Sequence, residues 1–110
     1  MNKIYSIKYS EDYRDDLKSA IKYIRTNLQN PIAAQNLKSE VIEKINVIIN
    51  NPYAYSVVSD EYLALKGYRF ALVKNYMIFF TVIEKQIEII RFLYGPMDWM
   101  NILRKENQEY

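Results

Sequence analysis

The fold is decided by residues 68–95, in which three apolar runs are separated by two polar pairs. The runs are YRFALV (68–73), YMIFFTVI (76–83) and QIEIIRFLYG (86–95), and the pairs are KN (74–75) and EK (84–85). Each run has strand length and is rich in β-branched and aromatic residues, and two polar residues are enough to close a tight hairpin. Residues 68–95 are therefore predicted to form a three-strand meander, with Asn75 taking the positive φ of the first turn.

The run 76–83 is predicted to lie inside the sheet. Thr81 is its only polar residue, and a strand that is apolar on both faces is covered on both faces. For the run 86–95, two arrangements are open. If Ile87, Ile89 and Leu93 face the helices, Arg91 is a buried charge that needs a partner, and if Ile90, Phe92 and Tyr94 do, Arg91 lies on an open face.

The residues before the meander predict one strand and a helical hairpin. Residues 3–9 alternate as a strand does, and Ser10 precedes acidic residues that suit the first turn of a helix. Apolar residues at helical spacing then mark a helix ending at 27–29 and a second one that begins at Asn30-Pro31 and stops at 50–52. The short link implies an antiparallel hairpin that covers one face of the sheet.

The connections after the hairpin are less regular. Residues 60–65 fit either a short helix or an extended segment, and Asp98 can cap a short C-terminal helix. The sequence thus predicts a single domain over residues 1–110. Its fold class is α+β with the order β-α-α-β-β-β(-α), in two layers, with an antiparallel sheet and the helical hairpin on one face.

The composition limits the possible chemistry. The 110 residues include no cysteine and no histidine, which excludes disulfides, triads built on histidine and most transition-metal sites, so no metal or cofactor is expected. The first residues lack the apolar core of a signal peptide and no run reaches the length of a membrane span, so we expect a cytoplasmic protein with no membrane partner. The formal net charge is only +2, and residues 62–95 hold five basic against two acidic side chains.

The element order and three motifs of the second half resemble the RelE/ParE toxin superfamily, the toxins of bacterial type II toxin–antitoxin systems. The motifs are Gly67-Tyr68-Arg69, the run 75–80 (NYMIFF) and the run 90–95 (IRFLYG) followed by Asp98-Trp99. The resemblance implies a cognate antitoxin as partner. It also implies one of two targets: RelE-like members cleave mRNA on the ribosome without a metal, and ParE-like members bind DNA gyrase without nuclease chemistry.

The resemblance gives Arg69 the leading role, because a guanidinium can hold two phosphate oxygens of an RNA in a metal-independent endoribonuclease. Lys66, Arg91 and Tyr94, with Glu61 as base, would complete such a catalytic site. The structural alternative is that Arg69 is a solvent-facing strand residue or pairs with an acid such as Glu61. Nuclease members carry a basic residue after the glycine that ends the last strand, where this chain has Pro96-Met97.

Residues near the C-terminus are the candidates for antitoxin binding. Met97, Trp99 and Met100 form a soft apolar cluster of the kind found in interfaces. The alternative is that the C-terminal helix caps the core with them. The sequence therefore predicts a toxin that inhibits translation by mRNA cleavage, with a gyrase-binding toxin or a decayed module that only binds antitoxin as the alternatives.

Overall fold

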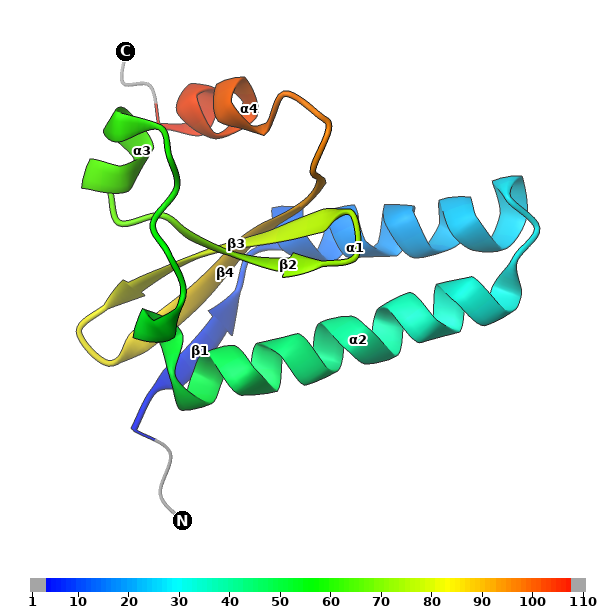
Figure 1. The fold of residues 1–110 in the computed structure, drawn as a ribbon, viewed down its shortest axis with the longest axis horizontal. Coiled ribbons are helices and arrows are strands. Elements are labelled where there is room, and N and C mark those ends of the chain that lie inside the picture. Colours follow the sequence, from blue (N-terminus) through cyan, green and yellow to red (C-terminus); the bar gives the residue numbers. More distant parts are fainter. Residues whose placement is uncertain (1–3, 108–110) are drawn as a thin grey trace.

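The structure is a computed structural model that describes residues 4–107. It forms one four-stranded sheet with helices on both faces (Figure 1). In chain order the elements are β1 (Ser6–Tyr9), α1 (Glu11–Lys22), the π-helical turn η1 (Tyr23–Asn27), α2 (Pro31–Asn50), the 3₁₀ turn η2 (Pro52–Ala54), α3 (Glu61–Leu65), β2 (Arg69–Val73), β3 (Tyr76–Ile83), β4 (Gln86–Tyr94) and α4 (Trp99–Glu106). The predicted α+β fold and element order are confirmed, although Lys3 of the first predicted strand lies outside the described residues.

The helical hairpin begins at the caps that the sequence predicts. The Ser10 hydroxyl accepts a hydrogen bond from the Tyr13 amide at 3.0 Å, which starts α1, and donates to the Ile90 carbonyl at 2.6 Å, which anchors it to β4. The Asn30 side chain accepts from the Ala33 amide at 3.0 Å, and Pro31 occupies the first turn of α2. Local capping thus determines where both helices begin.

The sheet has the strand order β1-β4-β3-β2, which places β3 and β4 at its centre. The meander pairs are antiparallel, but β1 runs parallel to β4. The expectation of a wholly antiparallel sheet is therefore wrong at this one pair. The hairpin carries the chain from β1 to the far edge of the sheet, and two reversals in the meander then bring β4 back beside β1 in the same direction.

The tight turns of the meander place their positive φ angles on residues other than Asn75. Lys74 has φ 53° and Glu84 has φ 56°. Val73 pairs with Tyr76, so Lys74 is the first residue of the two-residue loop, and the first position takes the left-handed conformation. The prediction of a turn at 74–75 is confirmed, whereas the assignment of its positive φ to Asn75 is wrong.

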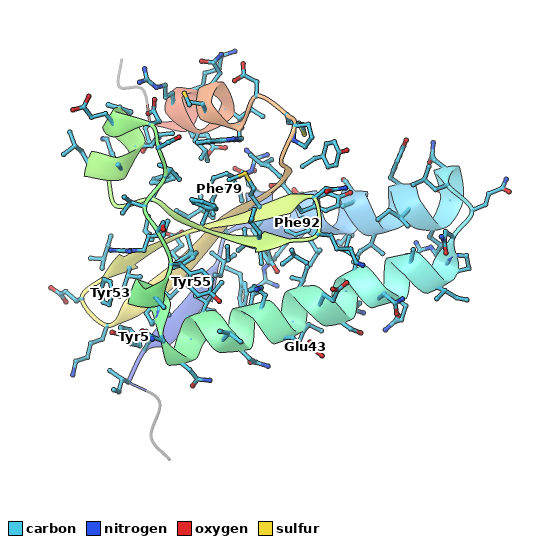
Figure 2. All side chains as sticks on the ribbon, viewed as in Figure 1. Tyr5, Glu43, Tyr53, Tyr55, Phe79 and Phe92 are labelled. Carbon is cyan, nitrogen blue, oxygen red and sulfur yellow. The ribbon has the colours of Figure 1, made fainter. Side chains whose placement is uncertain are left out.

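Both faces of the sheet are covered, so the fold has three layers and the two-layer expectation is wrong. The hairpin packs on one face and forms the main core, in which Leu37, Val41, Ile48 and Phe80 are buried. Helices α3 and α4 cover the other face and form the second core with Leu63, Phe79 and Leu103. Figure 2 shows Phe79 on the side of α4, and Phe80 next to it packs on the hairpin side.

A β-bulge decides which residues of β4 face the hairpin. On β3, Phe79 opposes Arg91 of β4, and the next residue, Phe80, opposes Ile89. Ile90 therefore has no residue opposite it and is the extra residue of the bulge. The first arrangement considered for β4 is right for Ile87 and Ile89 and for Arg91 as a largely buried charge with a partner, but wrong for Leu93. The second is right only for Phe92, because the alternation breaks at this bulge. The β4 side chains in the main core are Ile87, Ile89 and Phe92.

The connection before β2 and the end of the chain are both helical. Asp60 caps α3 by accepting from the Leu63 amide at 3.1 Å, which decides the open choice over residues 60–65 in favour of a helix. The predicted C-terminal helix is present as α4 and lies beside α3 (Figure 1). Among the helices of residues 4–107, none is long and apolar enough to cross a membrane.

Candidate functional site

The two arginines predicted to hold phosphate lie on opposite faces of the sheet. Arg69 pairs with Phe80 across β2 and β3, and Arg91 pairs with Phe79 across β3 and β4. Directly opposed residues share a face, and neighbours along a strand do not. Arg69 and Arg91 therefore cannot bind the same phosphate group.

Arg69 contacts the loop that follows α2. Its guanidinium donates to the Tyr55 carbonyl at 2.5 Å and lies 5.0 Å from the centre of the Tyr53 ring. Figure 2 shows both tyrosines beside the C-terminal end of α2. Among the described residues no carboxylate lies within 4 Å of Arg69, so the suggested pair with Glu61 is absent there. Arg69 holds this loop against the sheet.

Arg91 links three elements through carboxylates. It donates to both oxygens of Asp16 on α1, at 2.6 and 2.9 Å, and also pairs with Glu106 on α4. The Asp16 carboxylate accepts a further bond from the Phe92 amide at 3.1 Å. Hydrogen bonding to Asp16 is the main cause that raises the pKa of Arg91. The Arg91 side chain is only 17% exposed, so the alternative that places it on an open face is wrong.

The other predicted catalytic residues are spread around the sheet. Lys66 and Glu61 lie at the two ends of α3, where the Lys66 ammonium is 5.3 Å from the Tyr62 ring. Tyr94 pairs with Tyr76 at the far end of β3, four residues from the Phe80 position that opposes Arg69. That offset is about 13 Å along the strand. The structure does not bring these residues together.

The cluster proposed for antitoxin binding is divided between the core and the surface. The Trp99 ring lies 5.3 Å from that of Phe79, and Met100 packs on the second core. Met97 is 47% exposed. Trp99 and Met100 therefore cap the core, as the structural alternative holds, and their contact with an antitoxin stays a prediction.

An ion pair between α3 and α4 was not predicted. Asp60 is 7% exposed, and Arg104 donates to its two carboxylate oxygens at 2.8 and 3.1 Å. The hydrogen bond from Arg104 is the main cause that lowers the pKa of Asp60. The two residues are 44 positions apart, and nothing in the sequence indicated that they pair.

A groove between α1 and α2 is the second feature that sequence reasoning missed. Five basic side chains and a single acidic one, Asp15, are among the residues that line it. The basic residues are Arg14, Lys18, Lys22, Arg25 and Lys38. Among its lining residues Tyr13 is buried, and burial is the main cause that raises the pKa of Tyr13 to about 12. The spacing of the cations along one helix was visible in the sequence, but acidic neighbours in the same segment concealed it in the net charge.

No candidate metal site is found among residues 4–107, where no three acidic side chains lie close enough to share an ion. Two features of the described residues are suited to binding: a basic groove on the hairpin and an arginine, Arg69, at the edge of the sheet.

Comparisons with known proteins identify the family. The family model of the ParE toxin of the type II toxin–antitoxin system parDE matches residues 7–99. A solved structure of the chromosomal ParDE toxin–antitoxin system from P. aeruginosa superposes with a TM-score of 0.69 at 18% identity, covering 84% of this chain and 98% of that one. The E. coli DinJ-YafQ toxin–antitoxin complex gives a TM-score of 0.59 at 19% identity, covering 83% and 92%.

A search of curated protein sequences gives no significant match. At these identities the solved structures show the fold, and the family model, which spans most of the chain, shows the family. The predicted membership of the RelE/ParE superfamily is confirmed. This chain belongs to the ParE toxin family of type II toxin–antitoxin systems.

Proposed function

We propose that the protein is a growth-arresting toxin that acts by binding its target, with DNA gyrase as that target, and that a cognate antitoxin neutralises it. The observation that carries the proposal is the position of Arg69 and Arg91 on opposite faces of the sheet. Metal-independent RNA cleavage needs a base, an acid and positive charge around one phosphate. The residues predicted for these roles are dispersed, and two carboxylates occupy Arg91.

Membership of the ParE family adds to the support, because the resemblance stated above connects ParE-like members with gyrase. The solved structures with this fold come from a ParDE system and a DinJ-YafQ complex, which supports an antitoxin as partner. A toxin that works by binding needs a complementary surface and no catalytic centre.

The experiment compares gyrase and mRNA directly. The purified protein is added to a DNA supercoiling assay with gyrase and, separately, to a coupled translation reaction whose mRNA is mapped by primer extension. We expect supercoiling to stop and the mRNA to stay intact. New ribosome-dependent 5′ ends in the mRNA with normal supercoiling would overturn the proposal.

Ribosome-dependent mRNA cleavage is the second candidate, favoured by one observation. Arg69 follows Gly67-Tyr68 and makes a single hydrogen bond, to a carbonyl. An arginine without a carboxylate within 4 Å among the described residues retains charge for a phosphate. The variant Arg69→Lys distinguishes RNA cleavage from target binding. A lysine keeps the positive charge but cannot hold two phosphate oxygens at once. Growth arrest by this variant should equal that of the wild type if the protein acts by binding.

The third possibility, a decayed module that binds antitoxin but poisons nothing, is tested by expression alone. We expect induction of the protein to arrest growth and co-expression of its cognate antitoxin to restore it. Normal growth with robust expression of the folded protein would favour the decayed module.

A further inference from the structure

Three tyrosines and a methionine form a surface strip near the end of β4. Tyr23, where α1 passes into η1, Tyr94 at the end of β4 and Met97 after it are about half exposed, at 52%, 42% and 47%. Tyr76, the first residue of β3, is half-buried. We call these four residues the tyrosine strip. None of them carries a charge.

The four residues are neighbours in space although they come from three parts of the chain. The rings of Tyr76 and Tyr94 lie 5.5 Å apart between centroids, at an interplanar angle of 62°. The Met97 amide donates to the Tyr94 carbonyl at 2.9 Å. Burial is the main cause that raises the pKa of Tyr76, and the nearby phenols of Tyr94 and Tyr23 raise it further. The strip therefore gathers at one place on the surface.

The tyrosine strip rests on the main core. The Tyr76 ring stacks on that of Phe92, with centroids 4.7 Å apart and planes 9° apart, and Phe92 is buried. The Gly95 amide donates to the Asn75 carbonyl at 2.7 Å, which fastens the end of β4 to the β2–β3 turn. A Cβ at residue 95 would lie 3.1 Å from that carbonyl oxygen, so glycine suits the close contact. Side chains that are fixed before binding lose less entropy when a partner arrives.

The chemistry of the tyrosine strip favours a protein over a nucleic acid. Tyrosine and methionine are enriched in the centre of protein interfaces, and tyrosine is among the residues that carry most of the binding energy. A nucleic acid would need cations for its phosphates, and the strip has none. No residue of the strip lines the basic groove between α1 and α2. The strip and the groove are thus separate surfaces of unlike chemistry.

The hydroxyl groups of the strip favour a partner that the protein meets as a free molecule. Within residues 4–107 the hydroxyls of its three tyrosines form no hydrogen bond, unlike that of Tyr68, which accepts one from Asn107. Aromatic rings with hydroxyls open to water are typical of interfaces between proteins that also exist apart, whereas the interfaces of permanent dimers are more apolar. This favours the target of a toxin over a permanent dimer of the chain.

We propose that the tyrosine strip is the surface through which the toxin binds gyrase, with the rings of Tyr23, Tyr76 and Tyr94 at the centre of the contact. The inference rests on the proposed function, in which gyrase is the target, and adds the surface of the toxin that is used. The facing surface of gyrase is a folded, uncharged patch that receives the rings and offers hydrogen-bonding groups to their hydroxyls.

The test measures the binding of purified toxin variants to gyrase, with and without DNA, and the toxin concentration that halves supercoiling. Tyr23→Ala with Tyr94→Ala removes two rings of the strip. Its matched control, Tyr53→Ala with Tyr62→Ala, removes two rings of similar exposure, 53% and 37%, elsewhere on the surface. Urea denaturation verifies that each variant is folded. The strip variant should bind gyrase at least about ten-fold more weakly, and the control should bind like the wild type.

A single added charge distinguishes a contact with protein from a contact with DNA. Met97→Lys adds a cation to the strip, and Val47→Lys adds one at similar exposure, 53%, on α2. Because an unpaired charge is costly to bury in an uncharged interface, Met97→Lys should weaken gyrase binding about ten-fold or more, and Val47→Lys should bind like the wild type. Tighter binding of Met97→Lys to the gyrase–DNA complex would mean that the strip contacts phosphates, and the inference would be wrong.

The outcomes distinguish this inference from the proposed function. If the wild type neither binds nor inhibits gyrase, the proposed target is wrong and the inference falls with it. If the wild type inhibits gyrase and the strip variant does so equally well, or the control loses as much as the strip variant, the target stands and the inference is overturned. A strip variant that inhibits gyrase normally but no longer binds the cognate antitoxin, or no longer forms a homodimer that the wild type forms, would assign the strip to another occupant and also overturn it.

Discussion

The cations of the meander and those of the helical hairpin have opposite roles. In the sequence, residues 62–95 carry the positive surplus, and residues 1–61 hold equal numbers of basic and acidic side chains. In the structure Arg91 is neutralised by two carboxylates and Arg69 contacts a loop, whereas the cations of α1 line an open groove and none of them has a carboxylate within 4 Å among the described residues. Net charge along a sequence therefore does not locate the basic surface, because the fold decides which charges are paired.

The largest expected effect comes from removing a meander cation. Arg91→Ala should lower the free energy of unfolding by about 2 to 4 kcal/mol, because it leaves the Asp16 carboxylate, which is only 15% exposed, without its cation. Urea denaturation measures the loss. Arg25→Ala is the control in the hairpin and should cost no more than about 0.5 kcal/mol. If Arg91→Ala and Arg25→Ala lowered the free energy of unfolding equally, the distinction between the meander and the hairpin would be wrong.

Arg69→Ala should have a smaller effect on stability, about 1 to 2 kcal/mol, because it removes one hydrogen bond and one contact with an aromatic ring. The loop around Tyr55 should also loosen. Hydrogen exchange of the amides in residues 53–58 measures this, with α2 as the internal reference. Unchanged exchange would mean that Arg69 does not hold the loop.

The Asp60–Arg104 pair should make stability depend on pH in the acid range. The pKa of Asp60 is lowered below its ordinary 3.8 in the folded state, so the ionised carboxylate stabilises the fold. This contribution is complete above about pH 5 and is lost as the pH falls through the folded pKa. Denaturation of the wild type and of Asp60→Asn should therefore differ most at neutral pH and converge below pH 3.8.

A double-mutant cycle assigns that dependence to the pair. In the Arg104→Ala background, Asp60→Asn should change the pH dependence much less, since the main cause of the lowered pKa is gone. The same pH dependence in both backgrounds would assign the effect to another contact of Asp60.

The smallest expected effect belongs to the groove. Lys18→Ala with Lys22→Ala should change the free energy of unfolding by no more than about 0.5 kcal/mol per residue, because both side chains are exposed and alanine favours a helix. Urea denaturation against the wild type measures this. A loss above about 1 kcal/mol per residue would show that these lysines are used within the fold and are not reserved for a partner.

Local chemistry made most of the fold predictable. Ser10 and Asn30 cap the helices where the sequence predicts, and the polar pairs at 74–75 and 84–85 close the hairpins. The bulge at Ile90 was not predictable, because alternation in the sequence continues through it and only the pairing with Phe79 and Phe80 reveals the extra residue. This bulge is also the reason why neither arrangement considered for β4 holds along the whole strand.

The candidate site was less predictable than the fold. Arg69 could be singled out from Gly67-Tyr68-Arg69, but its contact with Tyr55 depends on how the loop after α2 packs. The partners of Arg91, Asp16 and Glu106, are 75 and 15 residues away along the chain. Ion pairs between residues so far apart along the chain leave no periodic pattern in the sequence.

By itself, the sequence determined the order of helices and strands, the caps and turns that bound them, and the family to which the chain belongs. These depend on spacing and local hydrogen bonding, which neighbouring residues supply. Tertiary structure alone decided the parallel strand pair, the second covered face, and which cations are paired or facing the groove. Those features depend on residues that meet only after folding, so no local pattern specifies them.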